Sequence, residues 1–144
     1  MYKRQLKRFL QNNIVDNKPA LDVYDAQVWL KTMLNQMAIY KIDKNEALKI
    51  LNTVYREASR AGMPPDLVLA VIVIESSFNR FAVSSAGALG VMQVMPFWKN
   101  EIGRASDNLV DIDTNIRYGC KILQYYWELS NNCLLYTSDA ADES

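Results

Sequence analysis

One carboxylate in the sequence, Glu75, occupies a position suited to a general acid. Glu75 directly follows residues 67–74, a run of eight apolar residues. If this run is a helix, the carboxyl group lies at its C-terminal end, where the helix dipole disfavours negative charge, and beside a core that excludes water. Both effects favour the protonated carboxyl, which can then donate its proton as a general acid. The alternative is an ordinary polar residue at the point where a helix leaves the core.

The composition excludes most other catalytic machinery. There is no histidine, so Ser-His-Asp and Cys-His catalysis and His-ligated zinc are excluded. The two cysteines, Cys120 and Cys133, are too few for a metal cluster or a disulfide framework. Sixteen basic and 16 acidic residues cancel, which argues against a nucleic acid or an anionic membrane held by bulk charge. Any acid–base chemistry must therefore come from carboxylates, with no metal and no other cofactor.

The first half of the chain is predicted to form two helices. Half of the 144 residues are apolar, which suffices for one domain with one core. Apolar residues at helical spacing predict a helix over residues 22–40. Asp43, with Glu46 three residues later, resembles a capping box and opens a second helix that Gly62 ends.

The apolar run itself has two interpretations. Residues 66–76 are either a buried strand or a helix buried on all sides. Their β-branched content favours a strand, whereas the Pro64-Pro65 start favours a helix. The elements expected after it are a loop and short helix over 84–95, a short segment from Pro96 to Gly103, and a final helix after Asp111 and Asp113. No run of apolar residues is long enough to span a membrane. The predicted fold class is all-α or nearly so.

Both ends of the chain break with this pattern. Residues 133–143 resemble the translation of a transposase-type sequencing-library adapter, and residues 2–5 resemble its other strand. Such segments do not belong in an argument about the fold. The expected organisation is therefore adapter at 1–5, an N-terminal helical lead-in at 6–42, a partial catalytic domain at 43–132 and an adapter-derived tail at 133–144.

The residues around Glu75 resemble the signature of the soluble lytic transglycosylase family, whose SLT domain has a lysozyme-like fold. The family pattern is Glu-Ser, a spacer ending in Ser-x-x-Gly-Ala-x-Gly, and then Leu-Met-Gln-x-Met-Pro. Glu75-Ser76 and residues 84–96 follow it, with Val91 in place of the usual leucine. Asn115-Ile116 with Gly119 is similar to the family's later Asn-Ile-x-x-Gly element. The resemblance covers about residues 51–127.

The resemblance implies one catalytic acid/base, Glu75, and a substrate cleft beside it. From the residues alone, the two methionines of the motif could simply fill space in the core, and Ser84 could be a turn residue. The Ser76 hydroxyl could hydrogen-bond to carbonyl groups at the end of its own helix. The residues that match the family's cleft positions are Ser84, Gln93, Met92, Met95 and Asn79.

The implied reaction cleaves the bond between N-acetylmuramic acid and N-acetylglucosamine in peptidoglycan glycan strands and forms a 1,6-anhydromuramic end. Retaining glycosidases ordinarily need a second carboxylate, and no motif supports one here, since Asp107, Asp111 and Asp113 belong to a loop and a helix cap. A hydrolytic muramidase of the same fold and a non-catalytic glycan-binding module are the alternatives. The implied location is the bacterial cell envelope, in the periplasm.

One piece of the family pattern does not occur in the sequence. The family carries an Ala-Tyr-Asn motif, whose tyrosine approaches the acid, in a helix beyond the Asn-Ile element. Tyr125-Tyr126 lies too close to Asn115 and lacks the following asparagine. We therefore expect the domain to be C-terminally truncated and the 144-residue chain to be poorly active or inactive by itself.

Overall fold

The fold is built from helices and turns. The structure is a computed structural model that describes the backbone of residues 23–142 and the side chains of residues 25–131. Within this part there is no strand, only two isolated β-bridges that join Leu89 to Val83 and to Val94. The all-α prediction is confirmed. The elements are α2 (Val23–Met37), the 3-10 helix η1 (Ala38–Tyr40), α3 (Lys44–Ala61), α4 (Pro65–Ser76), α5 (Trp98–Ile102) and α6 (Ile112–Asp142).

The first two predicted helices form, with boundaries set by local chemistry. The Asp43 carboxylate accepts hydrogen bonds from the backbone N–H groups of Asn45 (3.1 Å) and Glu46 (3.3 Å) and so caps α3. Gly62 ends α3 in the left-handed conformation, with φ of 69°. The helix predicted over residues 22–40 is α2 followed by η1. Residues 1–22 lie outside the described residues, and these include the expected adapter at 1–5 and residues 6–22 of the lead-in.

The apolar run is a helix, α4, with Pro65 in its first turn. A strand would leave its backbone N–H and C=O groups without partners, because residues 23–142 form no other strand that could pair with it. Helix α4 packs against α3, and one side of it lines a cavity shared with α2 and η1. This enclosure explains why nearly all sides of the helix are apolar. The buried residues of α4 are Leu67, Val68, Leu69, Val71 and Ile72.

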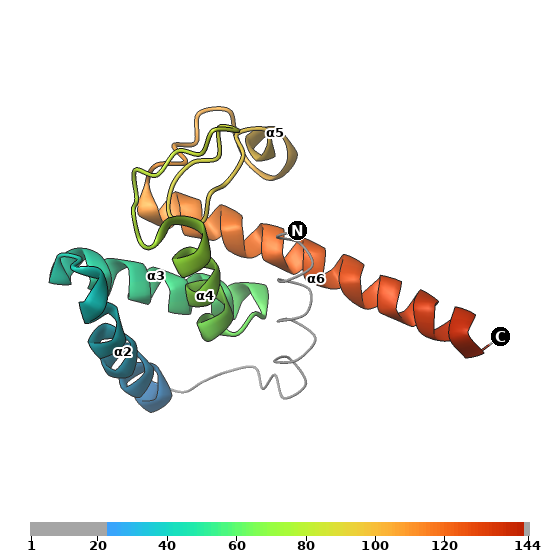
Figure 1. The fold of residues 1–144 in the computed structure, drawn as a ribbon, viewed down its shortest axis with the longest axis horizontal. Helices are drawn as coiled ribbons and strands as arrows, with labels where there is room; N and C mark the ends of the chain where they lie inside the picture. Colours follow the sequence, from blue (N-terminus) through green and yellow to red (C-terminus); the bar gives the residue numbers. More distant parts are fainter. Residues whose placement is uncertain (1–22, 143–144) are drawn as a thin grey trace.

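The short helix expected within residues 84–95 does not form. This segment consists of turns, because Gly87, Gly90 and Gln93 have φ of 95°, 79° and 52°, values that interrupt a right-handed helix. The expected segment before Gly103 does contain a short helix, α5. The turns and α5 together form the irregular part of the molecule above the N-terminal half of α6 in Figure 1.

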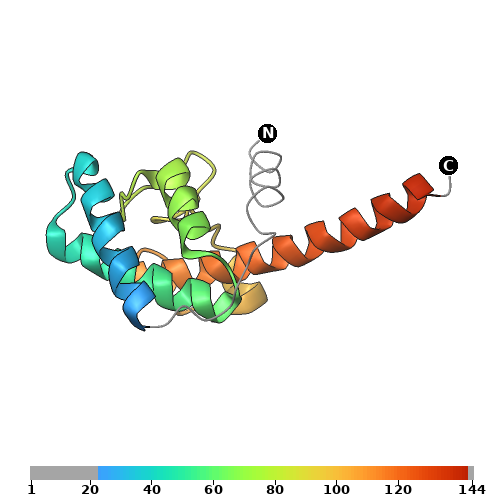
Figure 2. The same ribbon diagram turned by 90° about the horizontal axis from the view of Figure 1, so that it is seen from below.

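Helices α3 and α6 lie side by side and form the centre of the fold, as Figures 1 and 2 both show. One face of α6 is buried at Ile116, Cys120 and Leu123, whereas Trp127 on the same face is only partly buried. The backbone of α6 continues past Asn132 to Asp142, and this last part projects away from the other helices. None of the helices in the described range has both the length and the apolar character that a bilayer crossing needs.

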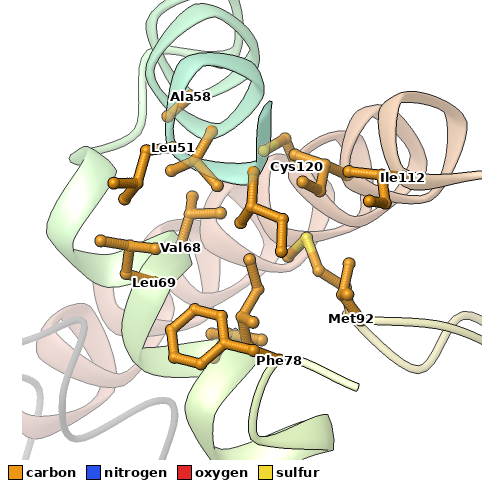
Figure 3. Packing of buried hydrophobic residues seen from close by; sticks show 14 of the residues in the cluster. Leu51, Ala58, Val68, Leu69, Phe78, Met92, Ile112 and Cys120 are labelled. Carbon is orange, nitrogen blue, oxygen red and sulfur yellow. The ribbon is translucent and has the colours of Figure 1, made fainter. Parts of the chain in front are cut away.

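The core joins side chains from all parts of the fold. Figure 3 shows Leu51 of α3, Val68 of α4 and Ile112 of α6 with Met92, which reaches the core from the turn segment. Cys120 is almost fully buried in this core, and burial raises the pKa of its thiol. It therefore acts as a small apolar side chain.

Candidate active site

Glu75 lies in the last turn of α4, half-buried, at the point where the chain reverses into the turn segment. The reversal uses Ser77 (φ 49°) and Phe78 (φ 67°), two consecutive residues in the left-handed region. This conformation is unusual for a bulky side chain and persists only when the surroundings hold it. Phe78 is held because its ring is buried and meets Tyr40 edge-on, with 4.9 Å between ring centroids. The buried Phe78 ring thus holds the backbone turn that follows Glu75.

The hydroxyl of Ser76 connects the acid-bearing helix to the turns over residues 84–96, which we call the motif loop. It donates a hydrogen bond to the carbonyl oxygen of Val91 at 2.7 Å and lies 3.2 Å from that of Ile72. The contact with Ile72 is the hydrogen bond to a carbonyl of the same helix that the sequence suggests. The contact with Val91 joins the end of α4 to a loop 15 residues later in the chain. Ser76 therefore sets the position of Glu75 relative to the loop.

Replacing Ser76 with alanine should loosen this connection without removing the acid. The Val91 carbonyl would lose its 2.7 Å donor, and a buried carbonyl without a donor costs about 1–3 kcal/mol. We expect a lower midpoint of urea unfolding and a lower kcat with little change in KM. Ser77→Ala is the matched control, since the Ser77 hydroxyl is exposed and reaches only the Val73 carbonyl of its own helix. Equal effects of the two substitutions would contradict a role for Ser76 in positioning.

The Gln93 side chain is held in one orientation. Its amide nitrogen donates to the carbonyl oxygens of Ala82 (3.0 Å) and Gly90 (2.9 Å). Because both partners are acceptors, the NH2 group has to face them, and Oε1 is directed away. No group among the described side chains and backbone donates to Oε1. A half-buried, rigidly held acceptor of this kind can receive a hydrogen bond from a ligand.

Ser84 and Asn79 both stabilise turns. Ser84 Oγ accepts a hydrogen bond from the backbone N–H of Ala88 at 2.9 Å, which leaves the hydroxyl proton available. Asn79 Oδ1 accepts from the backbone N–H of Phe81 at 3.0 Å and so steadies the loop after the acid. The turn interpretation of Ser84 therefore holds, and a ligand contact through its proton is compatible with it.

The two motif methionines differ in their surroundings. Met92 is buried, and a side chain at Gly119 of α6 would collide with its sulfur. This placement supports the core-filler interpretation for Met92. Met95 is only half-buried and can present its side chain to a ligand.

Asn115 joins the motif loop to α6 and was not assigned a role from the sequence. Its side chain is fully buried, and Oδ1 accepts from the Met92 N–H at 2.8 Å. Nδ2 donates to the carbonyl oxygens of Leu89 (2.8 Å) and Leu109 (2.7 Å). The signal in the sequence is an asparagine on the otherwise apolar face that Ile112 and Ile116 form, because a polar group there must find partners.

The other half-buried carboxylates near the loops have structural partners. Asp107 accepts from the Tyr118 hydroxyl and the Arg104 N–H, and these hydrogen bonds hold its pKa below the usual value. The hydrogen bonds from Thr114 lower the pKa of Asp111 in the same way. Both groups are therefore ionised at neutral pH and cannot supply a proton.

Two further half-buried carboxylates are also engaged. Asp113 accepts from the Thr53 hydroxyl at 2.7 Å, and Glu46 pairs with Arg80 at 3.7 Å. Within residues 25–131, by contrast, no group donates to Glu75 or pairs with it. Glu75 is thus the half-buried carboxylate that the described residues leave available for chemistry. The same range contains no group of three His, Cys, Asp or Glu side chains that could hold a metal ion.

A cavity of about 750 Å³ lies on another side of α4. Its α4 wall consists of Asp66, Leu69, Ala70 and Val73, and its other walls come from α2, η1 and Phe78. Successive helix residues are rotated by about 100°, so Glu75 lies on the side of α4 opposite to this wall. The cavity is therefore separate from the candidate acid.

Comparison with known proteins places these features in one family. The model of the transglycosylase SLT domain matches residues 52–139. The membrane-bound lytic murein transglycosylase C of Edwardsiella ictaluri is 38% identical over 86 residues, which cover 60% of this chain and 22% of that protein. The protein of the same name from Haemophilus influenzae is 36% identical over 97 residues, covering 61% and 26%.

The chain thus spans only about a quarter of the length of these relatives. No solved structure matches it. The family match covers the end of α3, the acid-bearing helix, the motif loop and α6, whereas α2 and η1 precede it. Since the match extends over more than half of the chain, the protein belongs to the transglycosylase SLT domain family.

Proposed function

We propose that the protein of which this chain is a part is a peptidoglycan lytic transglycosylase, and that Glu75 is its single acid/base. The observation that carries the proposal is the half-buried carboxyl of Glu75, which has no partner among the described residues and directly precedes Ser76, the residue hydrogen-bonded to the motif loop. The names of the relatives, which are lytic murein transglycosylases, support the same activity. The SLT domain match supports it independently of any one relative.

In the proposed reaction, one carboxyl group acts twice. Glu75 first donates its proton to the glycosidic oxygen, so that the bond from N-acetylmuramic acid C1 to this oxygen breaks and N-acetylglucosamine leaves. The substrate's own N-acetyl group stabilises the positive charge at C1. The Glu75 carboxylate then takes the proton of the muramoyl C6 hydroxyl, whose oxygen bonds to C1. The products are a 1,6-anhydromuramic end and a regenerated acid, with no water consumed and no cofactor.

The motif loop supplies substrate contacts in this proposal. Gln93 Oε1 would accept a hydrogen bond from a sugar N–H or O–H, and the Ser84 hydroxyl would donate one. Met95 would provide an apolar wall, and Asn79 holds the loop that carries these groups. An internal C6 hydroxyl competes well with water because it is already positioned, provided that the site excludes bulk solvent.

The substrate determines the proposed location. Peptidoglycan lies outside the cytoplasm, and the relatives are named as membrane-bound murein enzymes. We therefore place the protein in the bacterial cell envelope, with the catalytic domain in the periplasm. An intact gene that encodes a cytosolic product with neither an export signal nor an anchor would contradict this location.

The experiment is an analysis of the products released from purified sacculi. It uses a protein that carries these residues together with the Ala-Tyr-Asn motif that the sequence lacks. We expect muropeptides with anhydromuramic ends, detected by mass spectrometry. Products heavier by one water would indicate a hydrolytic muramidase instead. Binding to sacculi without any release would indicate a glycan-binding module.

A further inference from the structure

A buried carboxylate on α3 gathers three arginines at the surface. Glu57 is only 4% exposed. Its Oε1 lies 3.3 Å from Arg56 Nε, 3.1 Å from Arg60 Nη1 and 3.8 Å from Arg117 Nε of α6. The guanidinium-bearing side chains are 46%, 64% and 49% exposed. We refer to Arg56, Arg60 and Arg117 as the arginine cluster.

The cluster holds more positive charge than the buried carboxylate requires. One cation would neutralise Glu57, whereas three are present, so the group has a net charge of +2. Lys121, one turn beyond Arg117 on α6, is exposed and adds a further positive charge to this side. The two surplus guanidinium groups repel each other, and a protein with zero net charge has no general excess of cations to place here.

The cluster also has unused hydrogen-bond donors. Arg56 and Arg117 face Glu57 through Nε, so the terminal Nη1 and Nη2 edge of each is not used by it. Arg60 faces it through Nη1 and retains Nη2 and Nε. Within residues 25–131, none of the three arginines makes another hydrogen bond or ion pair, although the charge of Arg117 also acts on the Asp107 carboxylate. Paired guanidinium donors of this kind match the two oxygens of a carboxylate.

We infer that the arginine cluster is a docking site for the carboxylate groups of peptidoglycan stem peptides. This inference rests on the proposed function, which makes peptidoglycan the substrate. Glu57 keeps the arginines together, and their free donor edges then pair with carboxylates of peptides attached to the same glycan network. The cluster lies on α3 and α6, outside the motif loop, and therefore binds the polymer without contacting the reacting bond.

The surroundings favour an acidic peptide over a lipid surface. A membrane-surface site combines cations with apolar side chains that enter the acyl layer. Of the large exposed apolar side chains of the described residues, Val28, Ile39, Ile74, Phe81, Val83 and Phe97 lie outside α3 and α6. Tyr125 and Leu129 follow on α6, about two and three turns beyond Arg117. The exposed neighbours of the cluster, such as Asn52 and Ser59, are polar.

The test compares binding of the 144-residue chain to intact sacculi and to glycan strands freed of their peptides by an amidase. It needs no turnover. We expect the wild-type chain to bind intact sacculi about tenfold more tightly than stripped strands at low salt, a difference of about 1.4 kcal/mol. This preference should disappear at high salt, because screening weakens exposed ion pairs. Equal binding to the two polymers would overturn the inference.

The variant is Arg60→Gln with Arg117→Gln, which leaves Arg56 to neutralise the buried Glu57. It should bind intact sacculi about tenfold more weakly than wild type and stripped strands equally well. Lys44→Gln with Lys49→Gln, on the same helix, removes the same charge and should bind as wild type. Arg60→Lys with Arg117→Lys keeps the charge but lacks the planar donor edge. Its affinity for intact sacculi should lie between that of wild type and that of the double glutamine variant.

Wild-type binding by the double glutamine variant would overturn the inference. Preferential binding of the wild-type chain to phosphatidylglycerol vesicles, lost in the same variant, would assign the cluster to a lipid surface and overturn it as well. Thermal melting of each variant reports folding. The chain could prefer peptide-bearing sacculi while the complete domain releases no anhydromuramic product. That combination would contradict the proposed function and still support the docking site.

Discussion

Glu75→Gln is expected to reduce the release of anhydromuropeptides at least about 10²–10⁴-fold, the contribution typical of a positioned acid/base. Glutamine retains the size of the side chain but has no proton to transfer, so neither the protonation of the glycosidic oxygen nor the deprotonation of the C6 hydroxyl can proceed. The assay measures anhydromuropeptides from purified sacculi by mass spectrometry, in a protein that carries the complete domain.

The Glu75→Gln protein should fold and bind as wild type. No described group pairs with the Glu75 carboxylate, so a neutral amide leaves no charged partner unpaired. Thermal melting and sacculus binding are measured with activity. Glu101→Gln is the matched control, because Glu101 is an exposed carboxylate on the short helix α5 and has no place in the proposed chemistry. Wild-type turnover by the Glu75 variant would end the assignment, as would an equal loss in the control.

Local chemistry in the sequence was sufficient to predict the ends of α3. The carboxylate of Asp43 bonds to N–H groups two and three residues away, and Gly62 adopts its left-handed conformation within the same turn. Whether residues 66–76 form a helix or a strand depends on the elements that pack around them. A uniformly apolar run has no periodicity to distinguish a helix from a strand, and the absence of a pairing strand decides the outcome. The prediction of a short helix within residues 84–95 was wrong for a comparable reason. A glutamine gives no indication in the sequence that its φ is positive, as it is at Gln93.

The candidate site was predictable where it depends on motif spacing and not where it depends on contacts between distant segments. Glu75 stands out from the sequence as an acid after an apolar run. The orientation of Gln93 requires carbonyl groups 3 and 11 residues away, and the connection from Ser76 to Val91 spans 15 residues. The arginine cluster joins α3 to α6 across 60 positions of sequence, so only the fold brings it together.

Asn115→Ala is expected to destabilise the fold by about 2–6 kcal/mol and to reduce activity in the protein that still folds. The substitution leaves two buried backbone groups without partners, the N–H of Met92 and the carbonyl of Leu109, and each costs about 1–3 kcal/mol. The carbonyl of Leu89 loses one of its two donors and keeps the N–H of Val94. The Asn115 amide is tightly packed, because any Cβ at Gly90 would collide with it. A domain with a margin of about 5–15 kcal/mol would lose much of its stability.

The measurement for Asn115→Ala is urea unfolding, followed by turnover of sacculi at a temperature where the variant is folded. Turnover should still fall, because Met92 and Leu89 belong to the loop that holds Gln93, and release of that loop displaces its acceptor from the substrate. Asn52→Ala is the control, since Asn52 is exposed on α3 and its replacement should change stability by less than about 0.5 kcal/mol. If the Asn115 variant lost less than about 1 kcal/mol, the three hydrogen bonds would not be holding the loop, and the position of Gln93 would need another cause.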